Sequence, residues 1–215
     1  MLDIVKKTAG RSVTEVRIIE AAVQLFSRQG YKGTSTREIA HLAEVNEATL
    51  FRCFIRKADL FWAAAESRLN RLKLGRELQQ GLATDLDPAI VVPMLVTFMV
   101  ENMSQRPELM RLLYVAGFEL PGADRMFREH LGPIFDAVNA YFGRCAARGV
   151  ICDLEPTIAT LGLAGAVSAH QNLHYLFTGR DLPWDARDAA PAYAQFWLNA
   201  LRQPAAKHQV VNSSD

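Results

Sequence analysis

Two short helical segments joined by a tight turn constrain this chain more than any other feature. Ser35 and Glu38 have the spacing of a capping box, which predicts a helix to about residue 43. Asn46 is a good N-cap for a second short helix, to about residue 53. With only Glu44 and Val45 between them, the two helices must pack together. This is the geometry of a helix-turn-helix, whose second helix enters the DNA major groove.

Helical periodicity continues through almost the whole chain. A capping box at Ser12 and Glu15 begins a helix that we expect to end at Gly30. A long helix is predicted from about Lys57 to Gln80. Further helices are expected near residues 88–104, 107–118, 124–148, 156–178 and 187–202. Without any alternating strand pattern, the chain is predicted to be all-α, with an N-terminal three-helix domain at 12–72 (helix-turn-helix at about 35–54) and a larger helical domain at 73–204.

Composition narrows the class of protein. The first 60 residues carry a net charge of +3 and the remainder carries −2, which fits a DNA-binding head on a slightly acidic body, although the asymmetry is weak. Three cysteines without a metal-binding spacing predict a reduced, cytoplasmic protein. The opening residues lack the apolar stretch of a signal peptide. The longest apolar run, residues 89–100, is too short to span a bilayer, so no membrane association is expected.

The second helix of the motif can be divided into an inner and an outer face at 100° per residue. Leu50 and Phe54 are four residues apart and should point inward, with Val45 behind them. Arg52 should point outward, where it can donate to guanine O6 and N7 or to a phosphate. The expected DNA-facing residues of this helix and its start are Asn46, Glu47, Ala48, Thr49, Phe51 and Arg52.

Phosphate contacts are expected at two other helix starts. Ser35, Thr36 and Arg37 lie where free backbone N–H groups, hydroxyls and a cation suit a phosphate oxygen. Lys57, at the start of the following helix, is placed for another phosphate.

The head resembles the TetR family signature in residue order and spacing over about residues 12–61. The matching residues are Arg17 to Ala22, Leu25-Phe26, Gly30-Tyr31, Thr34-Ser35, Ile39-Ala40, Ala43, Val45, Thr49-Leu50-Phe51, Phe54, Lys57 and Leu60-Phe61. The resemblance implies an all-helical homodimer with a DNA-reading head and a ligand-sensing body. Most members are repressors that a small molecule releases from double-stranded operator DNA.

Several positions depart from that signature. Glu44 and Ala48 stand where the family usually has glycine, and Asn46 replaces a serine but can still cap. Phe51 lacks the hydroxyl of the common tyrosine, and Cys53 replaces a frequent histidine, so each substitution removes a potential phosphate contact. Arg56 stands where a serine cap is common.

A small, largely apolar effector is expected to bind in the body. The candidate walls are aromatic, methionine and histidine side chains, with Tyr114 or His170 as the polar anchor: Met94, Phe98, Tyr114, Phe118, Phe135 and His170. The alternative is that these residues form ordinary core. By analogy with the family, the dimer interface should consist of the helices near 156–178 and 187–202, where Gly162, Gly165 and Ala169 share a face of small side chains. The alternative is that these faces pack inside one subunit.

Other functions have weaker support in the sequence. No nucleophile elbow, phosphate-binding glycine loop or cofactor motif appears, so an enzyme is not expected. His170 and His174 have a spacing that can hold a metal, but no Glu accompanies them in an HExxH arrangement. Pocket-lining or core histidines are favoured instead, and we expect no metal. Cys53 between two arginines could serve as a redox switch, or simply as a small spacer. A nonspecific DNA-packaging protein would normally be far more basic.

Overall fold

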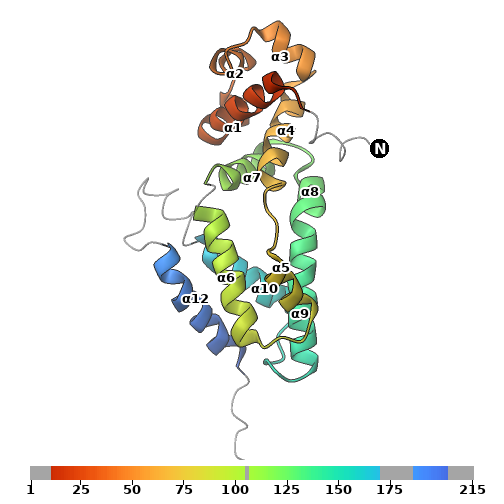
Figure 1. The fold of residues 1–215 in the computed structure, drawn as a ribbon, viewed down its shortest axis with the longest axis vertical. Coiled ribbons are helices and arrows are strands. Elements are labelled where there is room, and N and C mark those ends of the chain that lie inside the picture. The colour runs from red at the N-terminus through yellow and green to blue at the C-terminus, as the bar shows by residue number, and fades with distance from the viewer. Residues whose placement is uncertain (1–10, 105–106, 170–185, 203–215) are drawn as a thin grey trace, which may run out of the picture. The chain divides into compact units, whose positions relative to one another are not determined.

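The computed structural model describes residues 11–104, 107–169 and 186–202. Within these ranges the chain is helical and contains no β-strand, which confirms the predicted all-α fold (Figure 1). The helices belong to two compact units, here called unit 1 and unit 2, with boundaries at Lys73/Leu74, Ser104/Gln105 and Leu131/Gly132.

Each unit combines segments that are distant in the sequence. Unit 1 contains α1 (Val13–Gly33), α2 (Thr36–Leu42), α3 (Glu47–Cys53), α4 (Lys57–Leu69), α7 (Pro107–Glu119), α8 (Ala123–Met126) and the π-helical turn η1 (Phe127–Leu131). Unit 2 contains α5 (Arg76–Ala83), α6 (Pro88–Ser104), α9 (Gly132–Ala147), α10 (Pro156–Ser168) and α12 (Ala186–Leu201). The segment α7–η1, which follows α6 in the chain, therefore packs with the N-terminal helices.

The predicted helix starts are confirmed. Ser12 with Glu15 and Ser35 with Glu38 both form reciprocal capping boxes, at the starts of α1 and α2. The Asn46 side chain accepts the Thr49 N–H at 2.7 Å and caps α3. Each cap satisfies a backbone donor that has no partner within the helix.

A cluster of aromatic rings forms the centre of unit 1. Phe26 of α1 and Phe61 of α4 are fully buried, and their ring centroids lie 5.1 Å apart in an edge-on arrangement. Tyr31 contacts both rings, and Trp62 packs against Phe61. Burial of such large side chains contributes about 2–3 kcal/mol each. The cluster therefore joins α1 to α4.

The prediction of one helix from Lys57 to Gln80 is wrong. The helix α4 ends at Leu69, and α5 begins after Gly75, which has extended backbone angles. Leu69 is buried in the core of unit 1, whereas Leu78 is buried in the core of unit 2. Because Gly75 costs about 1 kcal/mol in a helix interior, the chain breaks near this residue, where it leaves one core for the other.

The helix expected at 124–148 is also interrupted, by η1 between α8 and α9. Pro133 explains the interruption, because it lies two residues after the end of η1 and has no N–H for a bond to the preceding turn. The helices α6, α7, α10 and α12 begin within one residue of the expected positions. Residues 170–178 of the predicted helix 156–178 lie outside the described residues.

Unit 2 is built around α6, α9, α10 and α12. Tyr141 and Phe142 of α9 are buried together, and the Tyr141 hydroxyl donates to the Leu86 carbonyl at 2.7 Å. Arg144, one turn further along α9, donates to the Leu82 carbonyl at the end of α5. These two bonds satisfy carbonyl groups that the end of α5 and the following loop would otherwise leave without partners.

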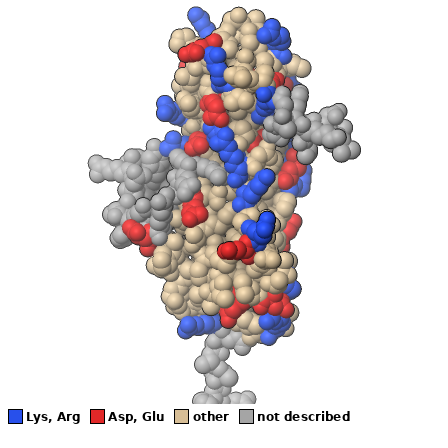
Figure 2. Space-filling view, in the orientation of Figure 1, with Lys and Arg blue, Asp and Glu red and all other residues tan. Residues whose placement is uncertain are grey.

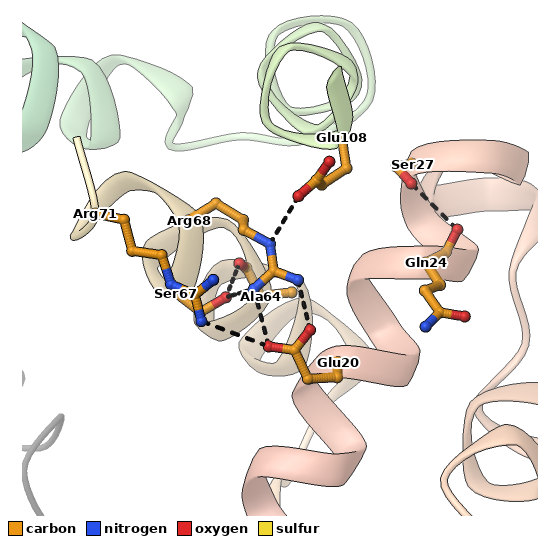
Figure 3. A network of polar contacts seen from close by, with 8 residues as sticks. All are labelled: Glu20, Gln24, Ser27, Ala64, Ser67, Arg68, Arg71 and Glu108. Atoms are coloured by element: carbon orange, nitrogen blue, oxygen red, sulfur yellow. Dashed lines mark hydrogen bonds and ion pairs between the residues drawn. The ribbon is translucent and has the colours of Figure 1, made fainter. Parts of the chain in front are cut away.

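Arg68 of α4 is a buried cation that joins three helices of unit 1 (Figure 3). Its guanidinium makes a bidentate pair with the Glu20 carboxylate of α1, with Nη1 donating to Oε1 at 2.9 Å. The Glu108 carboxylate of α7 lies 3.3 Å from Nε as an ion pair, without the alignment of a hydrogen bond. The Arg68 hydrogen bonds hold the pKa of Glu20 below its ordinary value of 4.5.

Replacing Glu20 by Gln should therefore destabilise unit 1 in a pH-dependent way. Near neutral pH we expect the free energy of unfolding to fall by about 1–2 kcal/mol, toward the low end for charged hydrogen bonds because the carboxylate is partly exposed. Since the folded pKa of Glu20 is lowered, its contribution is complete above the unfolded pKa and is lost as pH falls through the folded pKa.

Urea unfolding at a series of pH values measures this effect. The curves of wild type and Glu20→Gln should converge as pH falls below the lowered folded-state pKa of Glu20, where both side chains are neutral. The matched control is Glu77→Gln on the exposed surface of α5, which should change little at any pH. A deficit in Glu20→Gln that stays constant down to pH 3 would contradict the role of the ion pair.

Candidate nucleic-acid interface

The turn between α2 and α3 is closed by backbone hydrogen bonds. The Ala43 N–H donates to the Ile39 carbonyl and the Val45 N–H to the Ala40 carbonyl, both at 2.9 Å. Ile39 and Leu50 are fully buried, so each helix presents one face to the core of unit 1. The pair is therefore held as a rigid helix-turn-helix.

The structure separates the two faces of α3 as predicted. Leu50 is fully buried, and Val45 and Phe54 pack against the core beside it. Thr49 is half-buried. The exposed residues of α3 and its cap are Asn46, Glu47, Ala48, Phe51 and Arg52.

Glu44 occupies the turn with a left-handed backbone, at φ +52°. This conformation favours glycine, and it costs a residue with a side chain about 1 kcal/mol. Arg17 of α1 offsets part of this cost: its guanidinium donates to the Glu44 carboxylate and to the Glu44 carbonyl, both at 3.1 Å, and also to the Ala43 carbonyl. A side chain on α1 thus holds the turn in the shape that glycine would adopt freely.

The hydroxyls at the start of α2 already have protein partners. Ser35 Oγ accepts the Glu38 N–H at 3.2 Å and donates to the Glu38 carboxylate at 2.7 Å. Thr36 Oγ1 donates to Glu47 Oε1 of α3 at 3.0 Å. Arg37 is exposed and adds a positive charge at the start of α2.

Acidic side chains near the motif are paired, whereas two arginines are not. Figure 2 shows basic and acidic residues interspersed on the face in view rather than gathered into a basic patch. Around the motif, Glu38, Glu44 and Asp59 each accept from a neighbouring protein donor. Among the described residues, Arg37 and Arg52 have no hydrogen bond or ion pair, so both cations are available to an anionic partner.

Lys57 lies against an aromatic ring at the start of α4. Its Nζ is 4.3 Å from the centre of the Tyr31 ring, a cation–π contact. Burial lowers the pKa of Lys57, while the charges of Glu119 and Glu38 act in the opposite direction. Tyr31 therefore positions the ammonium group next to the motif.

Glu119 is a positioning residue that sequence reasoning missed. Its carboxylate, at the end of α7, accepts the Lys32 N–H at 2.8 Å. At Gly30, where φ is +74°, a Cβ in place of the glycine hydrogen would come within 2.7 Å of the same carboxylate. The end of α7 thus fits into the kink of α1, just before the loop that leads to α2. No local pattern could indicate this contact, because 87 residues separate the partners.

The predicted effector residues are divided between the two units. Met94 and Phe98 of α6 pack on the core of unit 2, and Phe135 of α9 is half-buried in the same unit. Tyr114 and Phe118 lie on α7 in unit 1, and Phe118 is 86% exposed. His170 and His174 lie outside the described residues.

Two shallow grooves lie on unit 2. One, of about 440 Å³, is lined by Met94 and by residues of α5 and the loop after it: Glu77, Gln80, Gly81, Thr84 and Leu86. The other, of about 330 Å³, lies between α5 and α9. Within the described residues, no three histidine, cysteine or acidic side chains gather as a metal site. Cys53 is half-buried against the core of unit 1.

The two glycines of α10 have different surroundings. A Cβ on Gly162 would come within 2.6 Å of the Trp197 ring of α12, so this glycine serves packing inside the unit. The corresponding position on Gly165 is open. Large apolar side chains are exposed on α10 and α12: Ile158 at 59%, Leu161 at 54% and Phe196 at 62%.

No helix in the described part of the chain is both long and apolar enough to cross a membrane.

Comparison with known proteins places the helix-turn-helix in a family. Residues 18–64 match the model of bacterial regulatory proteins of the tetR family. The chain is 27% identical over 207 residues to the transcriptional regulator AcrR of Shigella flexneri, covering 89% of this chain and 94% of AcrR. It is 32% identical over 102 residues to the uncharacterised regulator YvkB of Bacillus subtilis, covering 47% of this chain but only 51% of YvkB.

The fold is shared with solved regulators. The structure of AibR in complex with isovaleryl coenzyme A and operator DNA superposes with a TM-score of 0.69 at 16% identity, covering 85% of this chain and 97% of AibR. Residues 18–64, which include the helix-turn-helix of α2 and α3, therefore form a DNA-binding domain of the tetR family type, and the chain is similar over most of its length to the transcriptional regulator AcrR.

Proposed function

We propose that the protein is a repressor that binds a near-palindromic operator as a homodimer and is released by a small, largely apolar ligand. The observation that carries the DNA-binding part is the charge arrangement around α2 and α3. Glu38, Glu44 and Asp59 accept hydrogen bonds from neighbouring residues, whereas Arg37 and Arg52 are exposed and free of ion pairs among the described residues. Arg52 extends from α3, the helix expected to enter the major groove.

Substituting Arg52 by Ala should weaken binding to the operator. If Arg52 donates to guanine, the loss should be about 1–3 kcal/mol on the specific site and much smaller on random DNA. A bound sequence selected from random oligonucleotides supplies the specific site, and binding titrations at two salt concentrations supply the affinities.

The matched control is Arg125→Ala, which removes the same charge from α8 of the same unit, where Arg125 pairs with Glu129. This variant should bind like wild type. An equal loss on specific and random DNA in Arg52→Ala, with a shallower salt dependence, would instead make Arg52 a phosphate contact. A selected site without two-fold symmetry would contradict the homodimer.

The dimer is proposed to form through α10 and α12. Ile158, Leu161 and Gly165 are spaced three and four residues apart and so share one face of α10. That face is apolar and exposed, and Phe196 of α12 is exposed as well. Large apolar side chains exposed together favour burial against a second copy, and the open space at Gly165 permits a close helix approach.

Ile158→Lys should shift the protein toward monomer, because it places a charge in the proposed interface. Sedimentation at micromolar concentration measures the mass, and operator binding should weaken in parallel. Ile90→Lys is the matched control, since Ile90 is a comparably exposed isoleucine on α6 (50%) and should leave the mass unchanged. A stable dimer of Ile158→Lys would exclude this interface.

The effector site is proposed to involve α6 in unit 2. Met94, Phe98, Met99 and Met103 are partly buried against the core there, and methionine adapts its shape to different apolar ligands. AibR was crystallised with isovaleryl coenzyme A, so acyl thioesters serve as first probes, in which the apolar acyl group is the part expected to contact these side chains. Coupling of about 1–3 kcal/mol would change operator affinity 5- to 150-fold.

A titration of the protein–operator complex with short-chain and long-chain acyl coenzyme A should release DNA. By linkage, operator DNA should weaken ligand binding by the same factor. Phe98→Ala should abolish release while DNA binding of the free protein is retained, and Ile90→Ala on the same helix should behave like wild type. A ligand that binds the protein but leaves operator affinity unchanged would contradict the effector role.

A further inference from the structure

The carboxylate of Glu47 is held in place on the exposed surface of the motif. Glu47 is the first residue of α3 and Thr36 is the first residue of α2. The Thr36 hydroxyl donates to Glu47 Oε1 at 3.0 Å, across the two helices. Part of the rotational freedom of this glutamate is therefore already lost before any partner binds.

The Glu47 carboxylate differs from those of the other acids near the motif in its hydrogen-bond partners. The Glu38 carboxylate closes a capping box with Ser35, and the Glu44 carboxylate is paired with Arg17. The partner of Glu47 is a single neutral hydroxyl, and its second oxygen, Oε2, has no partner among the described residues. An ionised carboxylate that accepts one hydrogen bond still has the capacity to accept others.

The chemistry of the DNA surface limits what such a group can contact. A carboxylate repels phosphates and has no proton to donate, so it can pair only with hydrogen-bond donors. In the major groove the base-edge donors are the amino groups of cytosine N4 and adenine N6. Adenine also presents the acceptor N7 on the same edge, which opposes a second carboxylate oxygen. Cytosine N4 is therefore the better partner for Glu47.

We propose that Glu47 is a specificity-determining residue that accepts a hydrogen bond from cytosine N4 in each operator half-site, and that Thr36 is the positioning residue that orients it. This inference rests on the proposed binding of operator DNA. On this proposal, the negative charge of Glu47 at the start of α3 selects a base and does not raise the overall affinity for DNA.

Parallel selections from random DNA test the proposal, with wild type, Glu47→Ala and Glu47→Gln. One position of the wild-type half-site should be cytosine. Glu47→Ala should lose that preference and bind random DNA equally or more tightly, because a negative charge is removed. Glu47→Gln should move the preference toward adenine, whose N6 and N7 match an amide. In wild type, replacing the cytosine by thymine should weaken binding roughly 5- to 150-fold.

The role of Thr36 is tested by its dependence on Glu47. Thr36→Val keeps the shape but removes the hydroxyl, and should reduce the cytosine-to-thymine discrimination. Thr36→Ser should retain it. Once Glu47 is alanine, adding Thr36→Val should change discrimination no further, whereas a purely structural role would still lower affinity on all sequences. Circular-dichroism melting curves confirm that each variant is folded.

Two different failures can be distinguished. In the first, wild type enriches a specific sequence, and Glu47→Ala enriches the same sequence with every cytosine retained. The role of Glu47 is then overturned, whereas operator binding stands. If wild type enriches no sequence at all, the proposed function itself fails, and this inference fails with it.

Discussion

The buried guanidinium of Arg68 connects the helices on which unit 1 depends. It pairs with Glu20 of α1 and Glu108 of α7 while it belongs to α4 (Figure 3). A buried cation requires such partners, because an unpaired charge in this position would be strongly destabilising. The Phe26–Phe61 contact also joins α1 to α4. Because Arg68 pairs with Glu108 as well, the same ion pairs fix where α7 packs against α1 and α4.

The segment α7–η1, from the middle of the chain, packs with the N-terminal helices in unit 1. Glu119 at the end of α7 accepts a backbone N–H at the kink of α1, and its charge acts on Lys57. Any movement of α7 relative to α1 would disturb the loop that leads into α2. This contact lies within unit 1 and is independent of the continuous helix expected between residues 57 and 80, which is interrupted near Gly75.

The recognition surface shows how a modest net charge is compatible with DNA binding. Glu44 and Asp59 are paired with arginines, so these two acids near the motif present less uncompensated negative charge. Arg17 has a double role, because it neutralises Glu44 and holds the left-handed turn that glycine would otherwise supply. The departure from the family pattern at Glu44 is thus accommodated by a contact from α1.

Local interactions could be predicted from the residue order alone. The capping boxes at Ser12 and Ser35, the Asn46 cap and the inward Leu50 depend on spacings of a few residues, where backbone geometry leaves little choice. The family signature likewise lies in one continuous segment. Tertiary structure alone decided the contacts of Arg17, Arg68 and Glu119, whose partners are 26 to 87 residues away. It also decided that Gly162 packs on Trp197 while Gly165 stays open. The physical reason is that helical periodicity specifies which face is buried, whereas the neighbour that buries it depends on how distant segments pack.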